Sequence, residues 1–466
     1  MDTLQEKLKK QIEGKEIFEL ARRCAYDYMD TVAKRKVFPT EQALQSLALF
    51  REAMPEQAEN PLEILDQLHR IGSPATVAQT GGRYFGFVNG GTIPTAVAVR
   101  WLNDVWDQNA ALSVMSPVVS ELEALCERWL AHLLGLPQGT AAGLVSGTST
   151  AILCSLVAAR NHLLSRMGWD VNSRGLFGAP ELRVIVGEQA HASVFKALSF
   201  IGLGRDRVVT VPADSQGCMI PGQVPRLDHT TLLILQAGNV STGAFDPFET
   251  LCGAARDADA WVHVDGAFGL WAAACRDRVH LTRGMERADS WSVDAHKTLN
   301  VPYDCGIVLC RHREILASAM QASGSYLLYG KDRDGMHYTP EMSRRARAVE
   351  LWATLKTLGR DGVDALVTGL CQRARQFAEG LQSRGFRVLN DVVFNQVLVA
   401  CETPDLTEKT LQAIQASGTC WCGGSVWEDE PVIRISVCSW ATTASDIDRS
   451  VEAFVRARAA ASGDCR

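Results

Sequence analysis

The segment from about residue 140 to residue 310 alternates short apolar runs with helical patterns, and this alternation constrains the fold more than any other feature. Apolar runs occupy residues 182–186, 232–236 and 261–265, and a further run occupies 306–309. Strand–helix alternation of this kind predicts an α/β layer. Polar residues that follow its strands are expected at the carboxyl edge of the sheet, where sites in α/β proteins gather.

The composition is that of a large protein of two or three structural units. The chain has 466 residues, 47% of them hydrophobic, and a formal net charge of -6, which gives no indication of nucleic-acid or membrane binding. No apolar run approaches the roughly 20 residues of a membrane span, and the charged N-terminus lacks a secretory signal. Fourteen scattered cysteines favour reduced thiols in a cytoplasmic enzyme, and no cluster has zinc spacing, so we expect no metal.

We predict three regions along the chain. Residues 1–95 form an N-terminal helical segment that takes part in dimerisation, residues 96–360 form a large domain, and residues 361–466 form a smaller C-terminal α+β domain. Apolar residues recur at helical spacing from residue 3 to about 35, which predicts an amphipathic helix. Its apolar face can pack on its own core or against a partner subunit, and the sequence does not separate these options.

Two further helices are predicted by their starts and their periodicity. Ser116 precedes Pro117, and a serine cap followed by proline at the first position specifies a helix start. Residues 341–358, which include three arginines, are also expected to be helical.

A small, hydroxyl-rich turn enters a predicted helix at Thr148 and Ser149. Free backbone N–H groups and the helix dipole favour a phosphate at such a position. Ordinary capping by either hydroxyl is the alternative. The turn lacks the lysine of a P-loop and the spacing of a dinucleotide fingerprint.

Three reactive side chains stand near the ends of predicted strands. His191 begins a helix after the 182–186 strand, Asp265 ends an apolar strand, and Lys297 lies between two short strands. A buried acid needs a partner, and a buried amine tends to lose its proton and become a nucleophile towards carbonyls. The ordinary alternatives are a structural histidine, a helix-capping aspartate and a surface lysine.

The substrate side of a site is suggested by aromatic residues. Tyr84, Phe85 and Phe87 alternate with glycines in residues 81–91, a pattern that suits the wall of a pocket for an apolar or aromatic side chain. Packing in a core or at a subunit boundary is the alternative. Arg434, in an apolar strand, can bind a carboxylate or serve a structural role.

Residues 323–338 combine glycines, charges and aromatic residues, which is typical of a loop that closes over an active site. Its candidate acids are Tyr326, Tyr329 and Tyr338, with His337 as a further option.

Taken together, a phosphate turn, a histidine, a strand-end aspartate and a buried lysine follow one another along one α/β layer. This is the set needed to hold pyridoxal 5'-phosphate (PLP). The chain also resembles, from about residue 80 to its C-terminus, the PLP-dependent group II amino-acid decarboxylases. The resemblance is carried by residues 116–123 (Ser-Pro…Glu-Leu-Glu), 261–267 (Trp-Val-His-Val-Asp-Gly-Ala) and 288–297 (Ala-Asp-Ser…Ala-His-Lys).

The resemblance implies an α/β fold of PLP fold type I. Its large domain is expected to hold a mainly parallel, seven-stranded sheet beside a smaller C-terminal α+β domain and an N-terminal helical segment, in a homodimer. The chain departs from the family at its phosphate turn and at Asn239, where the family has threonine. The resemblance implies that Lys297 is the Schiff-base lysine and that His296 is its neighbour at the cofactor. It also implies that Asp265 is the partner of the ring nitrogen, that Ala267 is a small residue under the ring and that His191 is the stacking imidazole. Thr148 and Ser149 would contact the phosphate, and Asn239 would contact the ring hydroxyl.

The implied reaction is decarboxylation of an L-amino acid to an amine and CO2, which makes the protein a carboxy-lyase. Of the loop acids, we select Tyr329 as the catalytic proton donor. Because this loop cannot be aligned securely with the family, another PLP reaction on the same scaffold is the alternative, whether aminotransferase, carbon–carbon lyase or oxidative aldehyde formation. The amino acid itself is not specified by the sequence.

Overall fold

A seven-stranded sheet forms the centre of the computed structural model, which describes residues 3–321 and 333–463. Its order is β1-β7-β6-β5-β4-β2-β3, and only β7 runs against its neighbours. The mainly parallel seven-stranded sheet is therefore confirmed. The strands are β1 (Ala141–Val145), β2 (Arg183–Gly187), β3 (Val209–Val211), β4 (Thr231–Gln236), β5 (Trp261–Asp265), β6 (Ser290–Asp294) and β7 (Gly306–Cys310).

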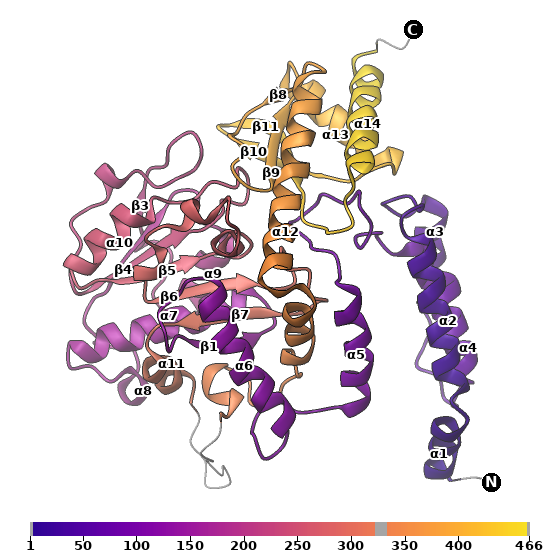
Figure 1. Ribbon diagram of the computed structural model, residues 1–466, viewed down its shortest axis with the longest axis horizontal. Helices are drawn as coiled ribbons and strands as arrows, with labels where there is room; N and C mark the ends of the chain where they lie inside the picture. The colour runs from indigo at the N-terminus through magenta and orange to yellow at the C-terminus, as the bar shows by residue number, and fades with distance from the viewer. Residues whose placement is uncertain (1–2, 322–332, 464–466) are drawn as a thin grey trace.

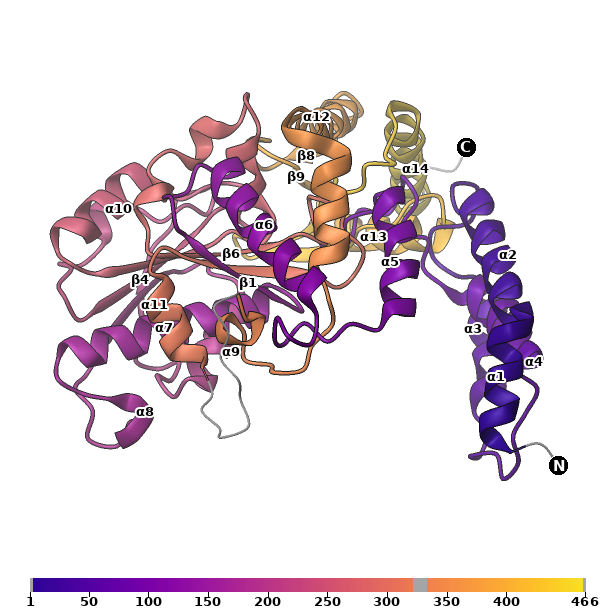
Figure 2. The same ribbon diagram turned by 60° about the horizontal axis from the view of Figure 1, so that its bottom comes forward.

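Helices cover both faces of this sheet (Figure 2). Alternate residues of one strand enter different cores: Leu233 and Leu235 of β4 pack in one, and Leu232 and Ile234 pack in the other. A strand buried on both faces needs no polar alternation, which is why these strands read as continuous apolar runs. The first core is closed by α6 (Pro117–Leu133), α10 (Phe248–Asp257) and α12 (Ala348–Gln382), and the second by α7 (Thr148–Arg166), α9 (Ala192–Phe200) and α11 (Arg313–Met320), with α8 (Val171–Arg174) following α7.

The N-terminal helices form an arm beside this body (Figure 1). The single helix expected from residue 3 to 35 is two helices, because Lys15 adopts a left-handed conformation with φ of 58°. The helices of the arm are α1 (Leu4–Gly14), α2 (Glu16–Thr31), α3 (Glu41–Ser46) and α4 (Pro61–Gln67), and α5 (Pro94–Trp106) then packs on α12.

The C-terminal part is built on a second, four-stranded antiparallel sheet of order β10-β11-β9-β8. Helix α12 leads into it and bends at Gly359, whose φ is 60°, two residues before the predicted domain boundary at 361. The elements are β8 (Arg387–Val388), β9 (Gln396–Ala400), β10 (Gly423–Trp427), β11 (Glu430–Ser436), α13 (Pro404–Ser417) and α14 (Ala444–Ser462).

The two predicted helix starts have different outcomes. The start at Pro117 is confirmed, since α6 begins there, but the Ser116 cap was wrong: within the described residues its side chain makes no capping bond and its buried hydroxyl has no partner. The predicted helix over 341–358 begins only at Ala348. The chain before it is held in an irregular path by ion pairs of its arginines, including Arg344 with Glu123.

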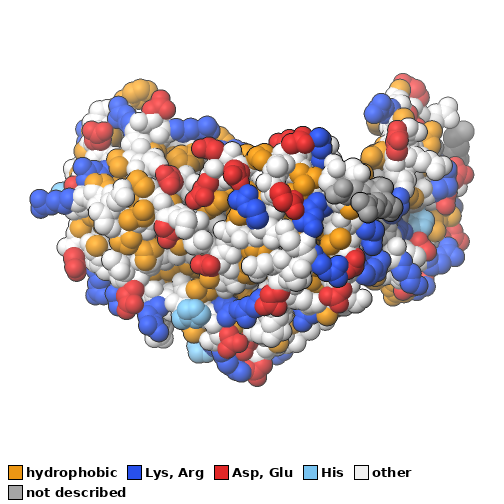
Figure 3. Space-filling model, turned by 90° about the horizontal axis from the view of Figure 1, so that it is seen from above, with side chains coloured by type: hydrophobic (Ala, Val, Ile, Leu, Met, Phe, Trp, Pro, Cys, Tyr) orange, Lys and Arg blue, Asp and Glu red, His pale blue; other side chains and the backbone are white. Residues whose placement is uncertain are grey.

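Within residues 3–321 and 333–463, no helix is both long and apolar enough to cross a bilayer. On the face seen in Figure 3, acidic and basic side chains are intermixed with apolar ones.

Candidate active site

A cavity of about 320 Å³ opens at the carboxyl ends of β4, β5 and β6. Strand ends and the start of α7 meet there because parallel strands point their carboxyl ends to one edge. Seven of the residues predicted for the cofactor line this cavity: Thr148, Ser149, His191, Asp265, Ala267, His296 and Lys297.

The start of α7 forms one end of the cavity. Thr148 is the first helical residue, and its buried hydroxyl has no hydrogen-bond partner in the described structure. An unsatisfied buried hydroxyl at a helix N-terminus is what a phosphate oxygen would satisfy, and the helix dipole favours the same charge. This end of the cavity therefore fits the phosphate of PLP.

Asp265 and His191 form the middle of the cavity. Asp265 is 5% exposed, and its carboxylate accepts a hydrogen bond from the Ala267 amide (3.2 Å). Burial raises the pKa of Asp265, and the nearby charges of His191 and Lys297 oppose that rise. A buried acid of this kind suits a cationic ring nitrogen as its partner.

His191 is fixed by its own helix start. Its Nδ1 accepts a hydrogen bond from the Ser193 amide (3.2 Å) and lies 2.7 Å from the Ser193 hydroxyl. Burial lowers the pKa of His191, with Asp265 acting in the opposite direction. A neutral imidazole held at the pocket can stack on a flat ring.

Lys297 lies in the cavity next to Asp294, an acid that the sequence analysis did not select. Its ammonium lies 3.2 Å from the carboxylate of Asp294, the last residue of β6. The neighbouring His296 also faces Asp294, at 3.5 Å. Asp294 ends an apolar strand just as Asp265 does, so the same signal was available in the sequence.

Not every predicted residue comes to the cavity. The Asn239 side chain caps its own loop by accepting from the amides of Ser241 (2.8 Å) and Thr242 (3.2 Å). Phe85 is fully buried against Phe377 in the core of the C-terminal part, and Tyr84 stacks on Trp421. None of the three predicted side chains lines the cavity.

Phe87 is the residue of the aromatic segment that does line the cavity, together with Val88. Both have positive φ, 52° and 60°, a strained conformation that tends to occur at functional sites. Phe87 is 61% exposed and stacks on Trp421. One glycine of this segment, Gly90, is required by close packing, because a Cβ there would collide with the Lys297 carbonyl.

Arg434 of β11 also lines the cavity. Its buried Nε has no hydrogen-bond partner, and no carboxylate in the described part of the chain forms an ion pair with it. Burial lowers the pKa of Arg434. A half-buried guanidinium with an unused donor is suited to an anion that enters from outside.

The two candidate loop acids that the structure describes are not brought to the cavity. Tyr338 packs under the guanidinium groups of Arg313 and Arg333, and neither it nor His337 lines the cavity. Tyr326 and Tyr329 lie outside the described residues.

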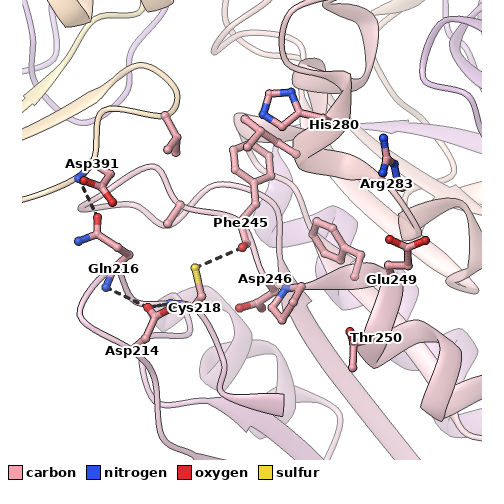
Figure 4. Close-up of a pocket in the computed structure, with 15 residues that line it drawn as sticks. Asp214, Gln216, Cys218, Phe245, Asp246, Glu249, Thr250, His280, Arg283 and Asp391 are labelled. Atoms are coloured by element: carbon pink, nitrogen blue, oxygen red, sulfur yellow. Dashed lines mark hydrogen bonds between the residues drawn. The ribbon is translucent and has the colours of Figure 1, made fainter. Parts of the chain in front are cut away.

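A second pocket, of about 450 Å³, lies between the 214–218 turn, the start of α10 and the loop of Asp391 (Figure 4). Its buried acid, Asp246, is already satisfied by the amides of Met219 and Gln236, each at 2.7 Å. The residues predicted for the cofactor do not line this pocket.

Comparison with known proteins identifies the family of the chain. The model of the pyridoxal-dependent decarboxylase conserved domain matches residues 43–400. The chain belongs to the pyridoxal-dependent decarboxylase family. Its cofactor is PLP, and the group II decarboxylase resemblance and the carboxy-lyase class are confirmed.

Members of this family differ in the reactions their names describe. The chain is 26% identical to the aromatic-L-amino-acid decarboxylase of Sus scrofa, with 89% of each protein covered. It is 27% identical to the phenylacetaldehyde synthase of a Rosa hybrid cultivar, over 73% of this chain and 72% of that protein. Among solved structures, the Oryza sativa TDC with PLP and tryptamine matches with a TM-score of 0.87 and 21% identity, over 96% and 98% of the two chains.

Proposed function

We propose that this decarboxylase acts on an apolar or aromatic L-amino acid in the cavity at the ends of β4, β5 and β6, and that Lys297 bonds the cofactor aldehyde. The observation that carries the proposal is the convergence of Lys297, Asp265 and the unsatisfied Thr148 hydroxyl on one cavity. When bound there, PLP supplies an electron sink for the bond that breaks.

The chain's own residues would orient that chemistry. Thr148 and Ser149 hold the phosphate at the start of α7, and the buried carboxylate of Asp265 keeps a proton on the ring nitrogen. Ala267 leaves room for the ring, and His191 lies against it and helps to fix the angle of the scissile bond. We keep Tyr329 as the proposed donor of the proton that replaces CO2.

Arg434 is the proposed anchor of the substrate carboxylate. Its unused Nε donor and its missing ion-pair partner among the described residues support this assignment. Phe87 and Val88 supply the apolar wall for the substrate side chain. The names of the pig decarboxylase and the rose synthase, which point to aromatic amino acids and their products, support the same substrate class.

We further propose that the protein is a cytoplasmic homodimer. The arm and α5 expose large apolar side chains that a second copy can cover. The thirteen cysteines in the described part of the chain are all free thiols, which suits a reducing compartment. The exposed apolar residues include Leu4, Leu8, Ile12, Phe18 and Met29 of the arm and Trp101, Leu102, Val105 and Trp106 of α5.

The second candidate function is oxidative aldehyde formation, favoured by the similarity to the rose phenylacetaldehyde synthase. One experiment separates the two. The PLP-loaded enzyme is incubated with a panel of amino acids, and CO2, amine, aldehyde, hydrogen peroxide and keto acid are measured together. Equal amounts of CO2 and amine are expected. Aldehyde with peroxide would replace the proposal by the second candidate, and keto acid without CO2 would contradict both.

A further inference from the structure

Asp294 occupies a position at which three groups of the cavity meet. Its Oδ1 accepts a hydrogen bond from the Thr148 amide (2.7 Å) at the phosphate turn. Its Oδ2 lies 3.2 Å from Lys297 Nζ and 3.5 Å from His296 Nε2. The residue is 2% exposed, so its charge is compensated by these neighbours rather than by water.

The carboxylate has little freedom to move away from these partners. The Asp294 amide donates to the Ala267 carbonyl (2.9 Å), and its own carbonyl accepts from the indole of Trp271 (3.0 Å). Both backbone groups are therefore fixed, and the side chain between them is held in the cavity wall.

His296 is oriented so that it supports the same carboxylate. Its Nδ1 accepts from the Cys305 amide (3.0 Å), and its ring stacks on Tyr303 with centroids 4.3 Å apart. Because Nδ1 is an acceptor, the ring hydrogen lies on Nε2, which faces Asp294. Asp294 Oδ2 therefore faces two donors, of which only Lys297 can swing towards a cofactor.

We propose that Asp294 is a positioning residue that holds the Lys297 ammonium whenever this lysine is not bonded to the cofactor. The proposal rests on the function proposed above for Lys297. It gives the two acids of the cavity different partners: Asp265 pairs with the ring nitrogen of the cofactor, and Asp294 pairs with Lys297. The ion pair keeps the nitrogen inside the cavity, and Lys297 must leave this contact before its amine can attack a carbonyl.

Asp294→Asn distinguishes the contribution of Oδ1 from that of Oδ2. The amide oxygen can still accept from Thr148, whereas the amide NH2 group that replaces Oδ2 cannot accept from Lys297. The reactivity of Lys297 in cofactor-free protein is measured by competitive labelling with an amine-reactive reagent at pH 7. Peptide mass spectrometry quantifies the label, with the exposed Lys356 as the internal reference.

We expect Lys297 to be labelled about tenfold faster in Asp294→Asn than in the unchanged protein, because the ion pair that holds its nitrogen against the cavity wall is lost. Asp265→Asn is the matched control, with the same isosteric change at the neighbouring strand end. It should change the labelling rate by less than about twofold, because Lys297 forms its ion pair with Asp294 and, among the described residues, none with Asp265. An unchanged rate in Asp294→Asn, or a larger increase in Asp265→Asn, would overturn the proposal.

A thermodynamic cycle tests the same pair without chemical labelling. Thermal midpoints are measured for cofactor-free unchanged protein, Lys297→Met, Asp294→Asn and the double variant. Lys297→Met leaves a buried carboxylate without its cation, and the second substitution removes that cost. The double variant should melt about 2 °C or more above the additive expectation, and strict additivity would contradict the pairing. Neither experiment needs cofactor, so their failure is distinguishable from failure of the proposed function.

Discussion

The ends of β5 and β6 present the same residue type in nearly the same place, with different surroundings. The strands pair in parallel, with Asp265 opposite Ser292, two residues before Asp294. Asp265 has one hydrogen-bond donor among the described residues, the Ala267 amide. Asp294 instead has the Thr148 amide, Lys297 and His296 around it. A strand-end acid thus has one donor in the first strand, where we propose that it meets the cationic ring nitrogen, and three partners from the chain itself in the next.

The largest effect is expected from removing the charge at the end of β5. Asp265→Asn should lower kcat by about 10³-fold, because a neutral amide cannot stabilise a cationic ring nitrogen while electrons enter the ring. The cofactor should stay bound through the phosphate turn and Lys297. CO2 release and PLP content are measured on the same preparation. Equal loss of turnover and cofactor would contradict the role given to Asp265.

The next largest effect concerns Arg434, the cation of β11 that lines the cavity. Arg434→Gln should raise KM by about 10- to 100-fold, because a charged hydrogen bond to the substrate carboxylate is lost. Steady-state CO2 release over a range of substrate concentrations measures KM and kcat separately. If Arg434 serves Asp265 instead, kcat will fall and KM will stay the same.

A smaller effect is expected when the contact between β6 and the phosphate turn is removed. Asp294→Ala deletes both oxygens, so the Thr148 amide loses its acceptor, whereas Asp294→Asn retains it. The alanine variant should be less stable than the asparagine variant by about 1–3 kcal/mol. Urea unfolding of the cofactor-free proteins measures the difference, and equal stability would show that Oδ1 does not hold the turn.

The smallest effect near neutral pH comes from His263 of β5, whose ring nitrogens face the Ser290 and Ser292 hydroxyls of β6. Burial lowers the pKa of His263 to about 3. Its contribution to stability is therefore complete above about pH 6.5 and is lost as the pH falls towards 3.

Between pH 6.5 and 5, His263 becomes protonated in the unfolded chain but stays neutral in the folded chain. This difference lowers the free energy of unfolding by roughly 2 kcal/mol. Urea unfolding at both pH values should show that His263→Gln loses less stability on acidification than the unchanged protein. An identical loss in both proteins would contradict the assignment.

The strands and the cofactor end of the cavity followed from the sequence, because apolar runs and strand-end polar residues are local signals. The side chains that were misplaced depend on distant parts of the chain. Tyr84 is turned away from the cavity by Trp421, more than 300 residues later. Asn239 is the exception, because its side chain accepts from the Ser241 amide two residues later, which is a local Asx turn.

Other differences have equally specific causes. Lys15 breaks the first helix through one left-handed residue, although the apolar spacing continues across it. Asp294 was missed although it ends an apolar strand as Asp265 does. What the sequence does not show is which groups surround it. Its importance became visible when Thr148, about 150 positions earlier, was found against it.

Lys297 is the residue that we propose to bond the cofactor, and this assignment can be tested directly. The PLP-loaded enzyme is reduced with borohydride, which fixes the cofactor to its lysine, and the digested protein is mapped by mass spectrometry. We expect one phosphopyridoxyl group per chain, on Lys297. A group on any other lysine, or a PLP-loaded enzyme that yields no labelled lysine, would contradict it.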